Sequence, residues 1–193
     1  MKKNNLKKSI EESILESSKI IQELSKDFTE IEKAIQEIIK CLKNNKKIII
    51  FGNGGSAADA QHIVAEFIGR FMLERKSLPA IALTSNSSII TALGNDYSFD
   101  KIFSRQCEGL VEEEDIVIGI STSGNSKNVL NGLMVSKKKG AITIGLLGSN
   151  GGKIGKVCDI PIIVSSASTP RIQEAHRTIY HIICDEVEKE FGK

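Results

Sequence analysis

The chain has 193 residues, of which 40% are hydrophobic and 26% are charged. This length and composition suit one globular α/β domain, residues 1–193, with a sizeable core and little room for a second domain. The net charge of +2 is too small for the broad positive surface of nucleic-acid binders, so we expect a small substrate and no nucleic-acid partner.

The N-terminal stretch, residues 1–8, is basic, but an amphipathic pattern follows it in place of the apolar core of a signal peptide. No apolar run approaches the roughly 20 residues that a membrane helix needs. The four cysteines show no paired spacing and each lies beside apolar residues, which favours reduced, buried thiols. We therefore expect a cytoplasmic protein with no membrane partner.

In residues 1–44 the apolar side chains recur at steps of three and four, which is typical of amphipathic helices. Asp27 and Glu30 match a capping box, so we expect two helices, residues 5–25 and 28–43. The apolar stripe of this helical pair has to be buried, and a second copy of the chain is a natural partner. We therefore predict a homo-oligomer.

The rest of the chain, residues 45–193, alternates β-branched runs with helical stretches. The expected strands cover residues 48–51, 80–84, 116–121, 141–147 and 160–164. The expected helices cover residues 56–72, 87–110 with an interruption at Gly94-Asn95-Asp96, 126–139 and 170–191. Strands that are apolar throughout are typical of a parallel sheet covered on both faces, so we expect a doubly wound, five-stranded α/β sandwich.

Two loops are unusual among those that follow the predicted strands, where open parallel sheets bind their ligands. The first, which we call the glycine loop, covers residues 52–59 (GNGGSAAD), and its glycines permit positive φ and close backbone approach to an anion. It also matches the dinucleotide pattern G-x-G-x-x-A, but the next strand ends in Thr84-Ser85-Asn86, without the acidic residue that binds ribose. We therefore expect no nucleotide cofactor; a tight turn without a ligand is the plainer alternative.

The second loop, which we call the serine loop, covers residues 121–126 (STSGNS) and precedes a predicted helix. It offers four hydroxyl groups and the free N–H groups of a helix start, and it carries no positive charge. Such a loop suits a phosphate dianion that arrives on a neutral sugar. The alternative, that Ser126 only caps the helix, explains one hydroxyl and leaves three.

Together the two loops resemble the sugar isomerase (SIS) domain family, from about residue 45 to the end of the chain. Further matching motifs are Ala60-Gln61-His62, Glu66 with Gly69-Arg70, Gly94-Asn95-Asp96, Phe103-Ser104-Arg105-Gln106, and Arg171-Ile172-Gln173-Glu174 with His181. The resemblance implies a homotetramer of single SIS domains that converts sedoheptulose 7-phosphate to D-glycero-D-manno-heptose 7-phosphate through an enediol, for the heptose of bacterial lipopolysaccharide or capsule. Two other classes stay open: a non-catalytic SIS regulator that binds a phosphosugar or a replication initiator, and an SIS lyase that acts on an N-acetylmuramic acid ether.

Moving a proton between two sugar carbons requires a base and a group that manages the oxygens. His62 and Glu66 are four residues apart in a predicted helix and so share one face. The resemblance assigns Glu66 as the base and His181 as the acid. It implies substrate contacts by Asn53, Gly54, Gly55, Ser56, Glu66, Asn95, Asp96, Ser121, Thr122, Ser123, Ser126 and Gln173. The plainer alternatives are a surface role for His62 and Glu66 and a helix cap for Asp96.

The resemblance also implies a zinc ion held by His62, Glu66, Gln173 and His181, although glutamine is an uncommon zinc ligand. If one helix contains both Gln173 and His181, they lie about 12 Å apart along its axis and about 80° around it. Either the helix starts late or bends near Gln173, or the ligands come from different chains. His176 receives no role from the resemblance, and we expect it to be structural or solvent-facing.

Overall fold

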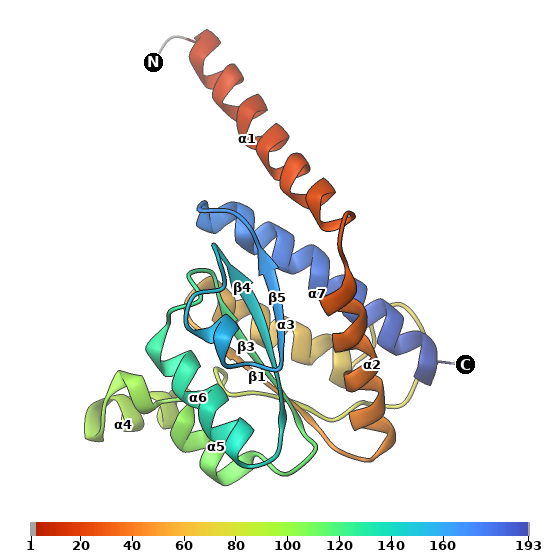
Figure 1. Cartoon of the computed structure of the whole chain (residues 1–193), viewed down its shortest axis with the longest axis vertical. Helices are drawn as coiled ribbons and strands as arrows, with labels where there is room; N and C mark the ends of the chain where they lie inside the picture. The colour runs from red at the N-terminus through yellow and green to blue at the C-terminus, as the bar shows by residue number, and fades with distance from the viewer. Residues whose placement is uncertain (1–2, 193) are drawn as a thin grey trace.

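The computed structural model describes residues 3–192 and contains one five-stranded sheet with helices on both faces (Figure 1). The strands are β1 (Ile48–Gly52), β2 (Ala80–Ala82), β3 (Ile116–Ser121), β4 (Ile142–Gly148) and β5 (Ile160–Val164). Their order is β2-β1-β3-β4-β5 and all neighbours are parallel, which confirms the predicted doubly wound sheet. The winding changes direction between β1 and β3, and ligands of such sheets bind at this switch point.

Helices cover the two faces of the sheet in separate layers. In chain order the helices are α1 (Lys3–Leu24), α2 (Thr29–Lys43), α3 (Gly55–Ile68), α4 (Ser87–Asp96), η1 (Phe99–Lys101), α5 (Ser104–Leu110), α6 (Lys127–Lys138), η2 (Ile154–Lys156) and α7 (Thr169–Phe191). One core cluster joins the sheet to α2, α3 and α7, and the other joins it to α5 and α6. In β1 the side chains alternate, so that Ile48 and Ile50 enter the first cluster and Ile49 and Phe51 the second. Burial on both faces explains why the strands are apolar throughout.

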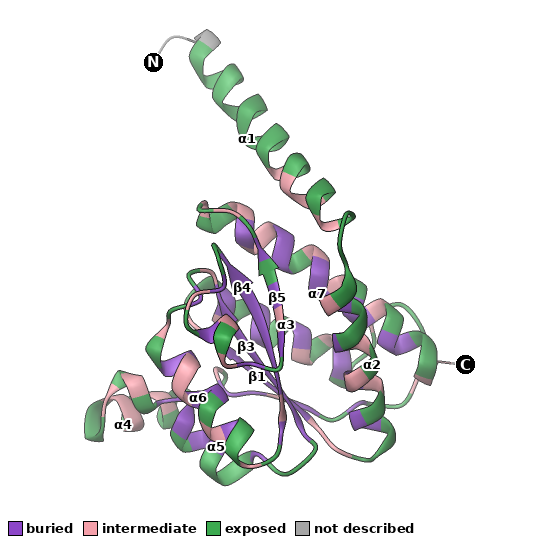
Figure 2. Ribbon diagram, in the orientation of Figure 1, coloured by how far each residue is buried: buried purple, intermediate pink, exposed green. Residues whose placement is uncertain are grey.

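The N-terminal helix α1 extends away from the body of the molecule (Figure 1). Only its last turns, at Ile20 and Leu24, pack against the core. Most of the α1 ribbon is green, for exposed, in Figure 2. Four large apolar side chains nearer its start are 50–64% exposed: Leu6, Ile10, Ile14 and Leu15. The stripe predicted to need a partner is therefore left open in the single chain.

The predicted helix pair forms, but the predicted capping box does not. The Asp27 carboxylate accepts the backbone N–H of Thr29, two residues on, at 3.0 Å, and Phe28 occupies the N-cap position of α2. The predicted helix 87–110 is likewise three elements: α4 runs through Gly94 and ends at Asp96, after which η1 and α5 follow. Two of these segments, η1 and α5, pack beside α6, whereas α4 contacts η1.

All four cysteines are free and buried, as predicted. Burial raises the pKa of the Cys107 and Cys158 thiols to about 11, so both stay protonated near neutral pH. Within residues 3–192, no helix combines the length and the apolar character required to cross a membrane. The basic N-terminal stretch begins with Met1 and Lys2, which lie outside the described residues.

Candidate active site

The glycine loop and the serine loop lie side by side at the switch point. Gly52, at the end of β1, is in register with Ile120 of β3, so the two loops leave the sheet from adjacent positions. The side-chain amides of Asn53 and Asn128 exchange two hydrogen bonds, each 2.9 Å long. Asn128, on α6 and 3% exposed, also accepts the backbone N–H of Val129. This reciprocal pair connects the glycine loop to the first turn of α6, which directly follows the serine loop. Sequence reasoning missed Asn128 because its partner is 75 residues away.

The serine loop gathers its hydroxyl groups around Ser121. The Ser121 hydroxyl lies 3.0 Å from that of Ser126 and 3.5 Å from that of Ser123. Ser126 occupies the N-cap position of α6, yet its side chain makes no capping hydrogen bond. The structure therefore does not support the alternative in which Ser126 only caps the helix. The hydroxyls and the N-terminus of α6 form a group of donors suited to phosphate oxygens.

Gly124 sets the path of this loop. Its φ is +64°, a value that side chains disfavour, and a Cβ there would overlap the backbone of Gly151 and Gly152. The Gly124 carbonyl accepts the N–H of Ile154 at 3.0 Å, and the Asn125 side chain accepts that of Lys153 at 3.1 Å. The segment after β4 thus holds the serine loop in place through these contacts.

The glycine loop leads directly into α3. Gly54 has a φ of +56° and occupies the N-cap position, and Gly55 is the first helical residue. The Gln173 amide at the start of α7 occupies the space that a side chain on Gly55 would need. Ser56 is 4% exposed and packs close to Gly52. The exposed backbone N–H groups of this helix start therefore lie beside Gln173.

His62, Glu66 and His181 form a second group farther along α3 and α7. The His62 Nε2 lies 3.2 Å from the Glu66 carboxylate and 3.3 Å from the His181 Nε2. The Glu66 side chain is 20% exposed, so the plainer alternative of a solvated surface residue does not describe it, whereas the His62 side chain is 43% exposed. Burial, assisted by the neighbouring His62, lowers the pKa of His181 below the ordinary imidazole value and favours its neutral form. A neutral imidazole can donate one proton and accept another.

The two groups are separated along α3. Contacts between α3 and α7 follow the same order on both helices, from Gly55 with Gln173 to His62 with His181, so the helices run parallel. Eleven residues separate Gly55 from Glu66, which places their Cα atoms about 16 Å apart along the axis. Because α7 is one helix from Thr169 to Phe191, it neither starts late nor is broken at Gln173. Within one chain, Gln173 therefore belongs with the glycine loop and not with the two histidines.

Asn95 and Asp96 lie elsewhere. They end α4, which has no buried residue and projects from the side of the molecule far from α7 (Figure 1). The Asn95 amide donates to the Asp96 carboxylate at 2.8 Å, and both residues are exposed. Asp96 is at the C-terminal end of α4, and the N-cap of that helix is Asn86, so the helix-cap alternative is wrong. The single chain does not bring these two residues to Glu66.

Asp59, the last residue of the glycine-loop motif, is a buried residue of α3 whose role sequence reasoning did not assign. It is 3% exposed and accepts hydrogen bonds from Arg177 at 3.0 Å and from Tyr180 at 3.2 Å. Burial raises the pKa of Tyr180 to about 12, and the Asp59 charge adds to the rise. These bonds hold α3 against α7 between the two groups. His176 is fully buried and bonds the Leu147 carbonyl at 3.0 Å, so of the two roles expected for it the structural one applies and the solvent-facing one is wrong.

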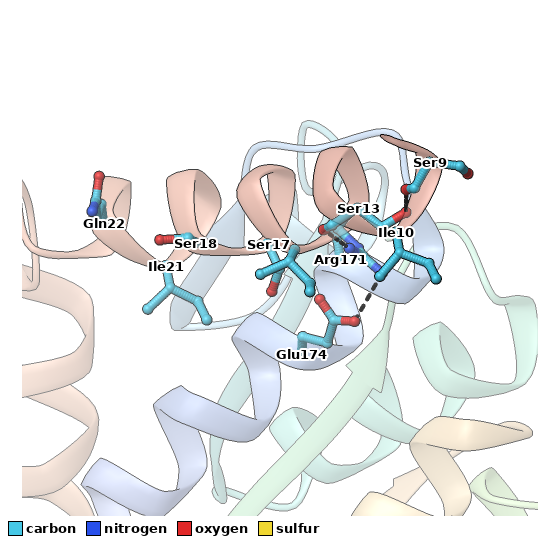
Figure 3. A pocket seen from close by; sticks show the side chains of 10 residues that line it. Ser9, Ile10, Ser13, Ser17, Ser18, Ile21, Gln22, Arg171 and Glu174 are labelled. Atoms are coloured by element: carbon cyan, nitrogen blue, oxygen red, sulfur yellow. Dashed lines mark hydrogen bonds and ion pairs between the residues drawn. The ribbon is translucent and has the colours of Figure 1, made fainter. Parts of the chain in front are cut away.

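A hollow lies apart from these residues, between α1 and the start of α7 (Figure 3). It has a volume of about 650 Å³, and none of the predicted site residues lines it. Arg171 points from α7 to the Ser13 carbonyl of α1 and pairs with Glu174 at 2.9 Å. The Arg171 of the sequence motif thus holds α1 in place.

The SIS domain family matches residues 14–148, from within α1 to the end of β4. The chain therefore belongs to the SIS domain family.

Its relatives narrow this class. Two proteins called phosphoheptose isomerase, from Geotalea daltonii and Sulfurimonas denitrificans, are 51% and 52% identical to it. The alignments cover 95% and 97% of this chain and 97% and 98% of theirs. A solved phosphoheptose isomerase from Neisseria gonorrhoeae is 39% identical, with a TM-score of 0.90 over 95% of this chain and 99% of that one. Within the SIS family, the chain groups with the phosphoheptose isomerases.

Proposed function

We propose that this chain is an aldose–ketose isomerase that converts sedoheptulose 7-phosphate to D-glycero-D-manno-heptose 7-phosphate. The observation that carries the proposal is the contact of Glu66, His62 and His181, in a chain whose serine loop offers phosphate donors at the switch point. A regulator that only binds a phosphosugar needs the serine loop but not this second group. The relatives are named isomerases, so neither the regulator nor the lyase is favoured.

The reaction assigns a separate task to each group. The serine loop binds the phosphate, and the Glu66 carboxylate removes a proton from carbon 1 of the ketose. The C–H electron pair forms the double bond of the enediol while the oxygen on carbon 2 takes a proton from His181. Glu66 then returns its proton to carbon 2, and His181 recovers a proton from the oxygen on carbon 1, which leaves the aldose.

The test is turnover of sedoheptulose 7-phosphate, followed by NMR of the aldose product. Glu66→Gln keeps the size of the side chain and removes the base, so we expect kcat to fall by about 10²–10⁴ with the fold retained by circular dichroism. Unchanged turnover in this variant would remove Glu66 from the reaction. No conversion by the wild-type chain, with or without added zinc, would favour the binding module.

We also propose that the active site is shared between chains of a homo-oligomer, as a tetramer. The separation of about 16 Å between Gly55 and Glu66 and the remote position of Asn95 and Asp96 support this. The exposed apolar face of α1 supplies a surface that needs a partner.

Co-expression of two inactive variants tests the sharing. Glu66→Gln lacks the base, and Ser126→Asp places a negative charge where the phosphate binds while keeping a good N-cap residue. In mixed oligomers, a shared site can combine an intact serine loop from one chain with an intact Glu66 from another. Activity should therefore return in the mixture; no recovery would place each site within one chain.

Zinc remains a proposal with a partial fit. The distances of 3.2 Å and 3.3 Å around the His62 Nε2 match the spacing of about 3.3 Å between ligands of a tetrahedral zinc ion. However, no group of three His, Cys, Asp or Glu in residues 3–192 is arranged to hold a metal, and Gln173 lies apart. A bound zinc ion would supply a Lewis acid for the sugar oxygens. Metal analysis of the purified protein, before and after chelation, tests whether it binds zinc.

The cytoplasmic location and the role in surface heptose biosynthesis also stay predictions.

A further inference from the structure

A buried ion pair joins the segment after α3 to the C-terminal half of α7. The side chains of Arg75 and Glu188 are each 1% exposed, with the Arg75 Nε 3.1 Å from the Glu188 carboxylate. The same carboxylate accepts three consecutive backbone N–H groups, of Phe71, Met72 and Leu73, at 2.5–2.7 Å. Glu188 therefore fixes the path of the chain immediately after α3.

Arg75 directs its two Nη groups to the end of α3, and the Nη1 also donates to the Lys76 carbonyl at 3.0 Å. Its Nη2 donates to the Glu66 carbonyl at 2.6 Å, and its Nη1 donates to the Phe67 carbonyl at 2.8 Å. The last carbonyls of a helix have no partner within the helix, and a positive charge there is favourable. Arg75 thus holds the last turn of α3, which carries the Glu66 side chain.

The Arg75–Glu188 pair also reaches His181. Glu188 follows His181 by seven residues on α7, which places both on one face, two turns apart. Phe71, whose N–H Glu188 accepts, has its ring centroid 5.5 Å from that of His181. The pair therefore contacts the backbone of Glu66 on one side and a neighbour of His181 on the other.

Stability alone does not account for such a pair. Burying two charges costs desolvation energy, and a buried ion pair replaced by well-packed apolar side chains is often neutral or stabilising. Lysine could supply the charge of Arg75 but not the fork that bonds a carboxylate and two carbonyls at once. What the pair provides specifically is a fixed position of the end of α3 relative to α7.

We propose that Arg75 and Glu188 are positioning residues for the isomerisation and set the separation between the Glu66 carboxylate and the His181 imidazole. This inference rests on the proposed function of those two groups. The hydrogen bonds of the pair go to α3 and to residues 69–76, and none goes to the serine loop. The pair therefore acts on the proton-transfer step and not on phosphate binding.

The experiment compares Glu188→Gln and Arg75→Lys with a matched control, Asp115→Asn. Asp115 is also a buried carboxylate: it is fully buried, bonds the backbone N–H groups of Lys47 and Glu112, and lies 2.9 Å from the Lys47 Nζ. It directly precedes β3, at the end of the sheet where the strands begin, and the two loops lie at the other end, where the strands finish. All variants are assayed in the full chain at a temperature where circular dichroism shows them folded.

Kinetics provide the first readout. We expect Glu188→Gln to lower kcat for sedoheptulose 7-phosphate by about tenfold to a hundredfold, with KM changed less than about twofold, because small displacements of reacting groups have effects of this size. Asp115→Asn should leave both constants near the wild-type values. A loss of kcat no larger than in Asp115→Asn, or a rise of KM alone, would overturn the proposal. If Glu188→Gln does not fold, Arg75→Lys is judged by the same criteria.

NMR of the histidine rings provides a second readout that does not require turnover. The rings of Phe71 and His181 are 5.5 Å apart, so a displacement of Phe71 in Glu188→Gln or Arg75→Lys should move the His181 resonances. Asp115→Asn should leave them in place. Unmoved His181 resonances in both variants would refute the positioning role. If the wild-type chain proves inactive, the proposed isomerase function fails, and the resonances still decide whether the pair positions His181.

Discussion

Asn128→Ala tests whether the reciprocal amide pair holds the two loops together. The substitution removes both 2.9 Å hydrogen bonds to Asn53 and the bond to the Val129 N–H. At about 0.5–1.5 kcal/mol each, and with water replacing the partners of half-buried Asn53, the three bonds sum to about 2–3 kcal/mol of unfolding free energy. For a chain of this length, that corresponds to a Tm lower by about 5–10 °C.

A double-mutant cycle isolates the pair itself. Asn53→Ala, Asn128→Ala and the double variant should give a coupling energy of about 1–2 kcal/mol in denaturant unfolding. A loss of substrate-binding free energy equal to this coupling energy would raise KM for the phosphosugar about five- to thirtyfold, with a smaller change in kcat. Asn131→Ala is the control on the same helix, because it loses one bond, to the Asp100 carbonyl, and should leave KM unchanged.

A coupling energy below about 0.5 kcal/mol would be indistinguishable from independent sites and would refute the reasoning. An unchanged KM in Asn128→Ala would show that the loops keep their positions without the pair.

Three further predictions concern the serine loop, acid stability and the N-terminal helix. Gly124→Ala adds a Cβ at a φ of +64° against the backbone of Gly151, so we expect a higher KM for the phosphosugar and a lower Tm; wild-type values for both would contradict this. Burial alone would raise the pKa of Glu188, but the three backbone N–H groups and Arg75 outweigh it and hold the pKa below its ordinary value of about 4.3. The ionised Glu188 therefore contributes to stability above about pH 4.3, and this contribution is lost as the pH falls through its lower folded-state pKa. The difference in unfolding free energy between wild type and Glu188→Gln should narrow below about pH 4. A difference that stays constant with pH would refute the lowered pKa of Glu188. The Ile14 side chain is 64% exposed in the single chain. Ile14→Glu should shift the mass measured by light scattering toward that of the monomer without unfolding the chain. Lys8→Glu, on the same helix, should leave the mass unchanged.

The order of strands and helices could be predicted from periodicity, because burial on both faces of the sheet requires apolar strands and amphipathic helices. The two loops could also be predicted from the sequence, because glycines and hydroxyl groups that follow parallel strands meet at the carboxyl end of the sheet. His62 and Glu66 were placed together by helix geometry alone. Each of these predictions depends on residues close in sequence.

The remaining features depend on how distant segments pack. The capping box failed because the Asp27 carboxylate bonds a nearer N–H, and the helix-cap alternative for Ser126 failed because its hydroxyl turns toward Ser121. The relative positions of α3 and α7 decide that His181 contacts His62 while Gln173 contacts Gly55. No local pattern encodes that alignment.

The sequence by itself therefore determined the fold class, and it singled out the serine loop and the residue types proposed to bind phosphate and to move protons. Only the tertiary structure decided which of those groups meet, that Asn128 connects the loops, and that Arg75 and Glu188 brace the helices behind Glu66 and His181. The physical reason is that a helix or strand follows from interactions among neighbouring residues, whereas side-chain contacts between elements follow from the packing of a shared core.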